Sequence, residues 1–252
     1  MNKREEDIFT KKAETIKAQS SNGTFQKIEH LLKILNNKHA DIKELKQSTK
    51  QQDIFLLKPS YELSKDILYI KIPSWSKRLG DIDRELIDIC KMNVDKYEKI
   101  VIDVRENQGG NSTTAHNFAG IFFKDKVIFG KIIKRDKKGK LEELKQILIP
   151  DKDIYIDKKI IILISKKCFS STELFLAPFK VAKRALLVGD KTAGGSANPI
   201  CEPLIINGKK YEVRIPTWKF FLKGKRKPLE ATRIDPDIKY LKNNIVEYTK
   251  KL

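Results

Sequence analysis

Apolar residues along the chain follow two different periods, and the change between them divides the sequence into two parts. Up to about residue 50, apolar positions recur every three or four residues between lysines and glutamates, which is the spacing of an amphipathic helix. These positions are Ile28, Leu31, Leu32, Leu35, Ile42 and Leu45. From about residue 54, short β-branched runs alternate with helical patterns. We therefore expect an N-terminal helical segment (residues 1–50) and one α/β domain (residues 51–252).

Four apolar runs in the second part are typical of strands that are buried on both faces. They are short and rich in β-branched residues, and they lie at residues 66–72, 99–104, 159–165 and 185–189. Helical patterns follow the first three, at residues 81–93, 112–123 and 171–184. Strands that alternate with helices predict a largely parallel sheet. Near the end of the chain, Asn207-Gly208 predicts a hairpin, and residues 239–252 predict a short helix.

Composition narrows the class of protein. The 252 residues carry a formal net charge of +19 at pH 7. Lysines supply most of this charge and are spread from end to end, which favours a solvated surface over specific nucleic-acid binding. No run approaches the roughly 18 apolar residues of a membrane span, and the charged N-terminus lacks a secretory signal. We expect a cytoplasmic protein if the chain is complete, and an extracytoplasmic one if a signal has been removed.

Neither a disulfide framework nor a metal site is indicated. Cys90, Cys168 and Cys201 show no C-x-x-C spacing, and their number is odd, so we expect small buried side chains rather than bridges. Histidine, cysteine and acidic residues show no metal-ligand spacing, and there is no phosphate-binding loop of the Walker type. We therefore expect no metal and no cofactor.

Three turns rich in glycine or serine follow three of the predicted strands. Gly109-Gly110 follows the second strand, Ser170-Ser171 the third, and residues 190–199 the fourth. Ligands bind at the carboxyl ends of strands in α/β sheets, so these turns are candidates for one shared site. Each also has a plainer interpretation. The glycine pair is compatible with a tight turn, and Ser170 with Glu173 matches the capping box of a helix.

Four blocks of sequence, in order, resemble the carboxy-terminal processing peptidase and tricorn-core family of serine peptidases. They are IVIDVRENQGG, IIILISKKCFSSTELF, ALLVGDKTAGGSANP and LEATRIDPDI. The resemblance covers about residues 60–240. It implies a crotonase-like α/β spiral of mixed sheet with flanking helices. Family members commonly carry a PDZ domain, for which residues 40–66 leave no room.

The resemblance also implies a nucleophile and an oxyanion hole. Ser170 matches the family nucleophile, which stands three residues before a glutamate, here Glu173. The oxyanion-hole amides match Gly109 and Ser171, with Gly110 completing the glycine turn. A position at the start of a helix suits a nucleophile, because the N-terminal dipole favours developing negative charge.

The proton acceptor is where this sequence departs from much of the family. The position of the usual lysine is Gly195, so a Ser–Lys dyad is not expected. The tricorn-like branch instead uses a histidine from an N-terminal helical segment and a glutamate near the C-terminal end. The blocks HLLKILNNKHADIKEL and LEATRIDPDI nominate His39 and Glu230 for these roles. Lys38 stands where tricorn has a serine before its histidine, and His116 is the alternative base.

Together these features predict a serine-type peptidase that acts on peptides or proteins. Ser170 would form an acyl-enzyme, His39 would act as base and then acid, and Glu230 would orient the imidazole. A catalytically inactive binding protein on the same scaffold is the main alternative. A basic nucleic-acid-binding protein is a further one, and steeply salt-dependent binding would reveal it.

Overall fold

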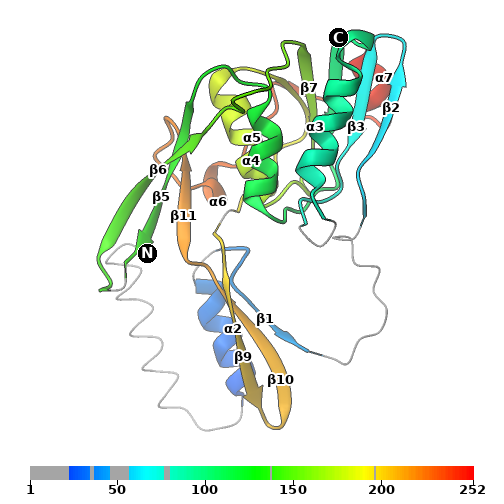
Figure 1. Cartoon of the computed structure of the whole chain (residues 1–252). Coiled ribbons are helices and arrows are strands. Elements are labelled where there is room, and N and C mark those ends of the chain that lie inside the picture. Colours follow the sequence, from blue (N-terminus) through cyan, green and yellow to red (C-terminus); the bar gives the residue numbers. More distant parts are fainter. Residues whose placement is uncertain (1–22, 35–36, 46–56, 77–79, 137, 196) are drawn as a thin grey trace. The chain divides into compact units, whose positions relative to one another are not determined.

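The computed structural model describes residues 23–34, 37–45, 57–76, 80–136, 138–195 and 197–252, which fall into two compact units (Figure 1). Unit 1 groups Met1–Gln51 with Ala197–Trp218, and unit 2 groups Gln52–Ser196 with Lys219–Leu252. In the described residues, no helix is long and apolar enough to span a membrane.

A six-stranded sheet forms the centre of unit 2, and it confirms the four predicted strands. Its order is β12-β8-β7-β4-β3-β2. All neighbouring strands run parallel except β2 and β3, which form an antiparallel pair. The strands are β2 (Ser60–Ser64), β3 (Ile67–Lys71), β4 (Lys99–Asp103), β7 (Lys159–Ile164), β8 (Leu186–Gly189) and β12 (Ile238–Lys239).

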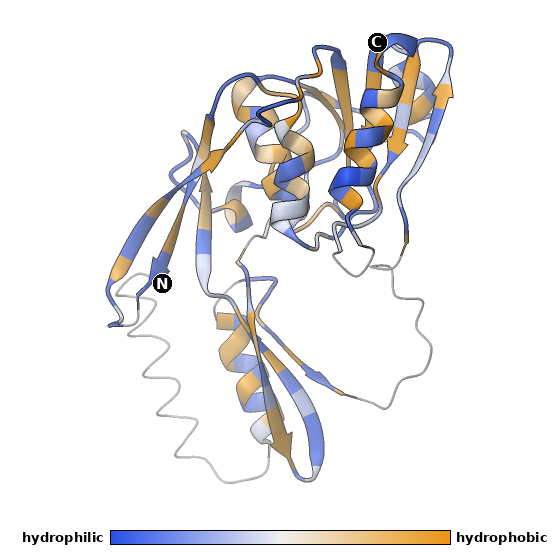
Figure 2. Cartoon of the chain, viewed as in Figure 1, coloured by the Kyte–Doolittle hydropathy of each residue, from blue (hydrophilic) through white to orange (hydrophobic). Residues whose placement is uncertain are grey.

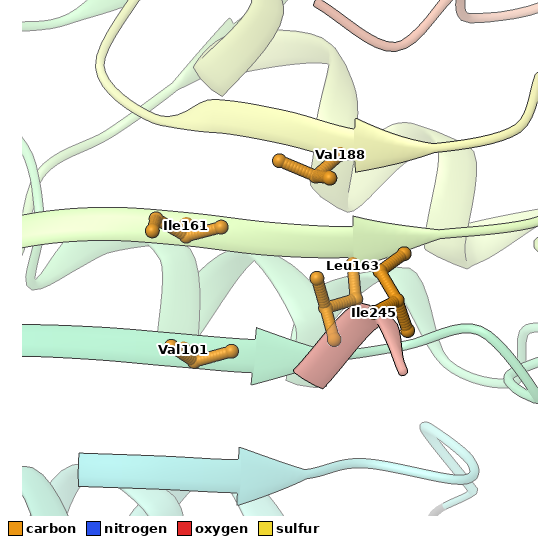
Figure 3. Close-up of a cluster of buried hydrophobic side chains, with 5 residues drawn as sticks. All are labelled: Val101, Ile161, Leu163, Val188 and Ile245. Carbon is orange, nitrogen blue, oxygen red and sulfur yellow. The ribbon is translucent and has the colours of Figure 1, made fainter. Parts of the chain in front are cut away.

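Helices cover both faces of this sheet, which explains why its central strands are apolar throughout. Ile245, on the C-terminal helix, packs against side chains of β4, β7 and β8 on one face (Figure 3). The larger helices lie side by side beyond the other face, and Figure 2 shows hydrophobic and hydrophilic residues mixed along α3 and α4. The helices are α3 (Ile82–Met92), α4 (Ser112–Gly120), α5 (Ser171–Ala182) and α7 (Ile245–Lys250), with the short 3-10 helix η3 (Val94–Lys96) after α3.

Aromatic side chains join α4 to α5 and extend to the loop after β3. Phe118 of α4 stacks on Phe175 of α5 with ring centroids 6.2 Å apart. Trp75 contacts both rings, at 6.3 and 4.9 Å. Since Trp75 is fully buried, it is a core residue that fixes the loop after β3 against α5.

Unit 2 also contains a second sheet that the sequence analysis did not anticipate. Its order is β11-β5-β6, and β5 and β6 form an antiparallel hairpin with a register shift between Ile128 and Gly130. Lysine and arginine interrupt β5, and glutamates and lysine interrupt β6, which hides the apolar pattern that marked the central strands. The strands are β5 (Val127–Arg135), β6 (Leu141–Leu148) and β11 (Trp218–Leu222).

Unit 1 packs one helix on a three-stranded antiparallel sheet of order β1-β10-β9. The predicted turn at Asn207-Gly208 joins β9 to β10 and is confirmed. The small core contains the buried side chains Leu32, Ile42, Tyr211 and Val213. The elements are α2 (Thr24–Ile34), β1 (Asp41–Glu44), β9 (Ile200–Ile206) and β10 (Lys209–Ile215).

The prediction of helix throughout residues 1–50 was wrong at β1. Residues 24–34 form the expected helix, but Asp41–Glu44 pair with β10, and Ile42 is opposite Val213. A partner strand about 170 residues away overrides the local helical spacing, because strand pairing depends on contacts that a local pattern does not contain. Residues 1–22 and 46–50 of the predicted segment lie outside the described residues.

Candidate active site

Ser170 lies at the turn between β7 and α5, in a backbone conformation that serine rarely adopts. Its φ is 57° and its ψ is −123°, in the left-handed half of the map that favours glycine. Backbone bonds on both sides hold it: Ser170 N–H donates to Gly195 O (2.9 Å), and Glu173 N–H donates to Ser170 O (2.9 Å). Within the described residues, the Ser170 hydroxyl makes no cap hydrogen bond to α5. Ser170 therefore occupies the N-cap position, but the predicted capping box is wrong.

Glu173 does not turn back to the helix start but binds the turn that follows β8. Its carboxylate is fully buried. It accepts hydrogen bonds from Thr192 Oγ1 (2.5 Å), Gly194 N (2.9 Å) and Gly195 N (2.8 Å). Burial and, as a smaller contribution, the charge of Glu230 raise the pKa of Glu173 to about 8 against the lowering effect of these donors. Through Gly195, Glu173 ties α5 to the residue that accepts the Ser170 N–H.

Gly195, the position of the family lysine, has no space for a side chain. A Cβ there would lie 2.3 Å from Cε2 of the Phe169 ring. Lys191, the nearest lysine before this turn, forms an ion pair with Asp235 at 2.8 Å. The packing at Gly195 agrees with the absence of a Ser–Lys dyad.

The Gly109-Gly110 turn lies directly against Ser170. A Cβ on Gly109 would be 2.9 Å from Ser170 Cβ and 3.2 Å from Ser171 N, so only glycine allows this approach. The Gly109 N–H donates to Asn107 Oδ1 (2.9 Å), and the Ser171 hydroxyl donates to Gly110 O (2.8 Å). In the described part of the chain, the N–H groups of Gly110 and Ser171 have no hydrogen-bond acceptor.

Glu230 belongs to α6 (Leu229–Thr232), which packs beside the same turn after β8. Thr192 joins the two segments, since its N–H donates to Ile234 O (3.1 Å) and its hydroxyl accepts from Ile234 N (2.9 Å). The charge of Glu230 acts on Glu173, so the two carboxyl groups lie near each other. Thus the predicted residues Ser170, Ser171, Glu173, Gly109, Gly110 and Glu230 all belong to unit 2.

His39 belongs to unit 1, where its side chain is only 2% exposed. The backbone N–H of His39 donates to Asn37 Oδ1 (2.9 Å). Burial, and then the positive charge of Arg214, lower the pKa of His39 to about 4. The imidazole is therefore neutral at pH 7 and able to accept a proton.

His116, the alternative base, is part of the packing between α4 and α5. Its Nε2 lies 3.3 Å from Leu174 O, and its ring meets Phe129 edge-on with centroids 5.4 Å apart. Burial lowers the pKa of His116. A carbonyl oxygen against this nitrogen favours a ring that donates there, which is a structural role rather than that of a base.

Two residues beside the glycine turn, Asn107 and Thr172, were not identified as candidates from the sequence. Asn107, Thr172 and Trp75 are fully buried and hydrogen-bonded to one another. The only available signal was an asparagine placed two residues before a glycine pair, at the end of a buried strand. Asparagine is common in such turns, so the pattern alone does not separate a structural role from a functional one.

Comparison with known proteins places this arrangement in a family. The model for peptidase family S41 matches residues 66–240. The tail-specific protease of Haemophilus influenzae is 29% identical over 133 residues, which are 52% of this chain and 18% of that protein. A Staphylococcus aureus protein named "Probable CtpA-like serine protease" is 34% identical over 120 residues, 47% of this chain and 23% of that protein. The chain thus spans less than a quarter of the length of these relatives.

A solved structure shows the same fold over nearly the whole chain. A lipoprotein from Streptococcus agalactiae superposes with a TM-score of 0.65 at 21% sequence identity, covering 97% of this chain and 86% of that one. The expected α/β architecture of mixed sheet and flanking helices is therefore confirmed. With a family model matched over more than half of its residues, the chain belongs to peptidase family S41.

Proposed function

We propose that this chain is a serine-type peptidase that hydrolyses peptide bonds through an acyl-enzyme on Ser170. The observation that carries the proposal is the strained backbone of Ser170 (φ 57°, ψ −123°) at a strand-to-helix turn. Such conformations cost on the order of 1–3 kcal/mol and persist mainly at functional sites. Because the hydroxyl does not cap α5 among the described residues, helix capping does not explain this serine.

The proposed reaction has two halves. Ser170 Oγ adds to the carbonyl carbon of a peptide bond while its proton passes to His39. The tetrahedral intermediate collapses, the C–N bond breaks, and the departing amine takes that proton. Water then attacks the acyl-enzyme in the same manner, releases a carboxylic acid and restores Ser170. Membership of peptidase family S41 supports peptides or proteins as the substrates.

The oxyanion would be stabilised by two backbone amides close to Ser170. Ser171 N–H, at the start of α5, is one donor. The resemblance in sequence implies Gly109 for the other, but the Gly109 N–H donates to Asn107 Oδ1 at 2.9 Å. We therefore assign the second donor to Gly110, whose backbone is exposed and whose N–H has no acceptor in the described residues.

His39 is the proposed base, and Glu230 is proposed to orient it. With a pKa of about 4 the imidazole is unprotonated throughout the neutral range, so one ring nitrogen is able to accept the Ser170 proton. Lysine is not the base in this proposal, since Gly195 stands at the usual lysine position with the Phe169 ring beside it. His116, with Leu174 O against its Nε2, is the less suitable histidine.

A fluorophosphonate probe tests the proposal, because it phosphonylates only an activated serine. Wild-type protein should be labelled at Ser170, as identified by peptide mass spectrometry, and Ser170→Ala should not be labelled. Ser60→Ala, on the exposed strand β2, is the matched control and should be labelled at the wild-type rate. A folded wild-type protein that resists the probe while a control serine peptidase is labelled would favour the inactive binding protein instead.

A further inference from the structure

A buried chain of hydrogen bonds links three side chains from separate segments of unit 2. Trp75 Nε1 donates to Thr172 Oγ1 (3.2 Å), and the Thr172 hydroxyl donates to Asn107 Oδ1 (2.7 Å). All three side chains are completely buried. The direction of each bond follows from the donors, because an indole N–H only donates and the threonine hydroxyl then has its proton left for Asn107.

This series of hydrogen bonds ends at the Gly109-Gly110 turn. Asn107 Oδ1 also accepts the Gly109 N–H (2.9 Å), while Asn107 Nδ2 donates to Ile72 O (3.1 Å). The side-chain amide of Asn107 thus has one possible orientation and three partners. A buried amide held at both its oxygen and its nitrogen has little freedom to move, so the position of Asn107 depends on Thr172 and in turn determines that of Gly109.

The Gly109–Gly110 peptide group and the one that follows it are each held by a hydrogen bond to the carbonyl oxygen. Trp75 N–H donates to Gly109 O (3.0 Å), and the Ser171 hydroxyl donates to Gly110 O (2.8 Å). In a trans peptide the N–H points opposite to the carbonyl, so the Gly110 N–H points away from Trp75. Ser171 and Thr172, at the start of α5, therefore help to orient the Gly110 amide, which is next in sequence to the Gly109 that lies against Ser170.

We propose that Thr172 and Asn107 are positioning residues that align the Gly110 amide with the Ser171 amide. The proposal rests on the serine-peptidase function proposed above. Removing one oxyanion donor costs about 10²–10³ in rate, and a displacement of about 1 Å can cost about 10². Loss of the Thr172 hydroxyl should therefore lower the rate of the chemical step without weakening binding.

The test uses the saturable reaction of a fluorophosphonate probe with the full chain, since its phosphonyl oxygen occupies the oxyanion hole. Thr172→Val keeps the shape of the side chain and removes the hydroxyl, while Thr172→Ser restores it. We expect Thr172→Val to lower the maximal labelling rate about 10–100-fold and to leave the half-saturating probe concentration within about twofold of wild type. Thr172→Ser should recover most of the rate.

Thr249→Val is the matched control. Thr249 is also a fully buried threonine, and its hydroxyl donates to Val246 O within α7 (2.8 Å), on a different element. This variant should lose stability to a similar degree yet label at the wild-type rate. If the labelling rate fell in both variants in proportion to their loss of stability, Thr172 would act only through stability, and the proposal would be overturned.

A second variant covers the case in which Thr172→Val does not fold. Ser171→Ala keeps the Ser171 N–H but removes the hydroxyl that holds Gly110 O, and it should slow labelling about 3–10-fold at unchanged half-saturation. Wild-type rates in the folded variants would overturn the positioning role while leaving the peptidase proposal intact. A wild-type protein that is never labelled at Ser170 would overturn the peptidase proposal itself.

Discussion

The two units differ in the surroundings that they give their candidate catalytic residues. In unit 2, Ser170 is in a strained conformation that backbone hydrogen bonds to Gly195 and to α5 hold in place. In unit 1, His39 precedes a four-residue strand, and the core cluster of the described residues there is small, with Leu32, Ile42, Tyr211 and Val213 buried. In the proposed mechanism, unit 2 therefore contributes a fixed geometry around Ser170, whereas unit 1 contributes a buried imidazole that is neutral at pH 7.

This difference follows from what each role requires. An oxyanion hole works only when its donors point at the developing charge before the reaction begins. A general base must have the right pKa and hydrogen-bond reach, and its hydrogen bonds can tighten when substrate binds. We therefore expect small steric changes to be severe in unit 2 and mild in unit 1, except at His39 itself.

The largest effect is expected at His39. His39→Ala should lower kcat about 10⁴-fold, the scale of losing a member of a catalytic triad, and should leave unit 2 folded. His30→Ala, at an exposed position of α2 in the same unit, is the control and should retain wild-type kcat. Steady-state hydrolysis of a peptide library, read by mass spectrometry, measures the change. Loss of activity in His116→Ala together with full activity in His39→Ala would move the base to His116.

One glycine turn from each unit allows a direct comparison of how the two units tolerate an added side chain. A Cβ at Gly110 would lie 2.5 Å from the Trp75 carbonyl carbon, whereas Gly208, in the hairpin of unit 1, has open space around it. Both have positive φ, 136° and 76°, so both variants carry the conformational penalty of about 1 kcal/mol for a non-glycine residue. Gly110→Ala should also lower the labelling rate at Ser170 by at least about 100-fold, because it displaces a proposed oxyanion donor.

Probe labelling and thermal unfolding of the two glycine variants provide the comparison. Gly208→Ala should label at the wild-type rate with a slightly lower unfolding temperature. If Gly110→Ala also labelled normally, the turn would tolerate a shift of its backbone, and the rigid oxyanion hole would be wrong.

A lysine introduced at Gly195 should not replace the histidine base. Its Cβ would meet the Phe169 ring at 2.3 Å, so the ring or the turn must move. In a His39→Ala background, Gly195→Lys should therefore leave kcat unchanged and destabilise the fold by about 1–3 kcal/mol, as overpacking commonly does. Adding Phe169→Ala removes the clash and is the matched control for stability. Recovery of kcat in the variant that carries only His39→Ala and Gly195→Lys would show that Phe169 does not obstruct a lysine.

The elements that could be predicted from sequence are those whose pattern is complete within one segment. The central strands, such as residues 159–164, are continuous apolar runs, and Asn207-Gly208 identifies its own turn. Strand β1 could not be predicted, because it is extended through its pairing with β10, in which Ile42 is opposite Val213. The same holds at the site. The resemblance nominated Ser170, but the bond from the Thr172 hydroxyl to Asn107 joins residues 65 positions apart and depends on the fold, which local sequence does not encode.

The smallest effect concerns the pH dependence of stability in unit 1. His39 has a pKa of about 4 when folded, below the ordinary value of 6.5. The unfolded chain therefore binds a proton more readily, so the stabilisation is complete above pH 6.5 and is lost as the pH falls toward 4, by up to about 1.4 kcal/mol per pH unit. His39→Gln, which cannot titrate, should lose this dependence.

Hydrogen exchange measures this effect locally, because the amides of β10 report the opening of unit 1. In the wild type, the opening free energy at these amides should fall between pH 6.5 and 5, once the intrinsic pH dependence of exchange is subtracted. The His39→Gln protein should show a smaller fall over the same range. His116→Gln provides the contrast, since burial also lowers the pKa of His116 but places its effect in unit 2. Equal slopes in wild type and His39→Gln would mean that His39 titrates normally, and the case for a buried neutral base in unit 1 would fail.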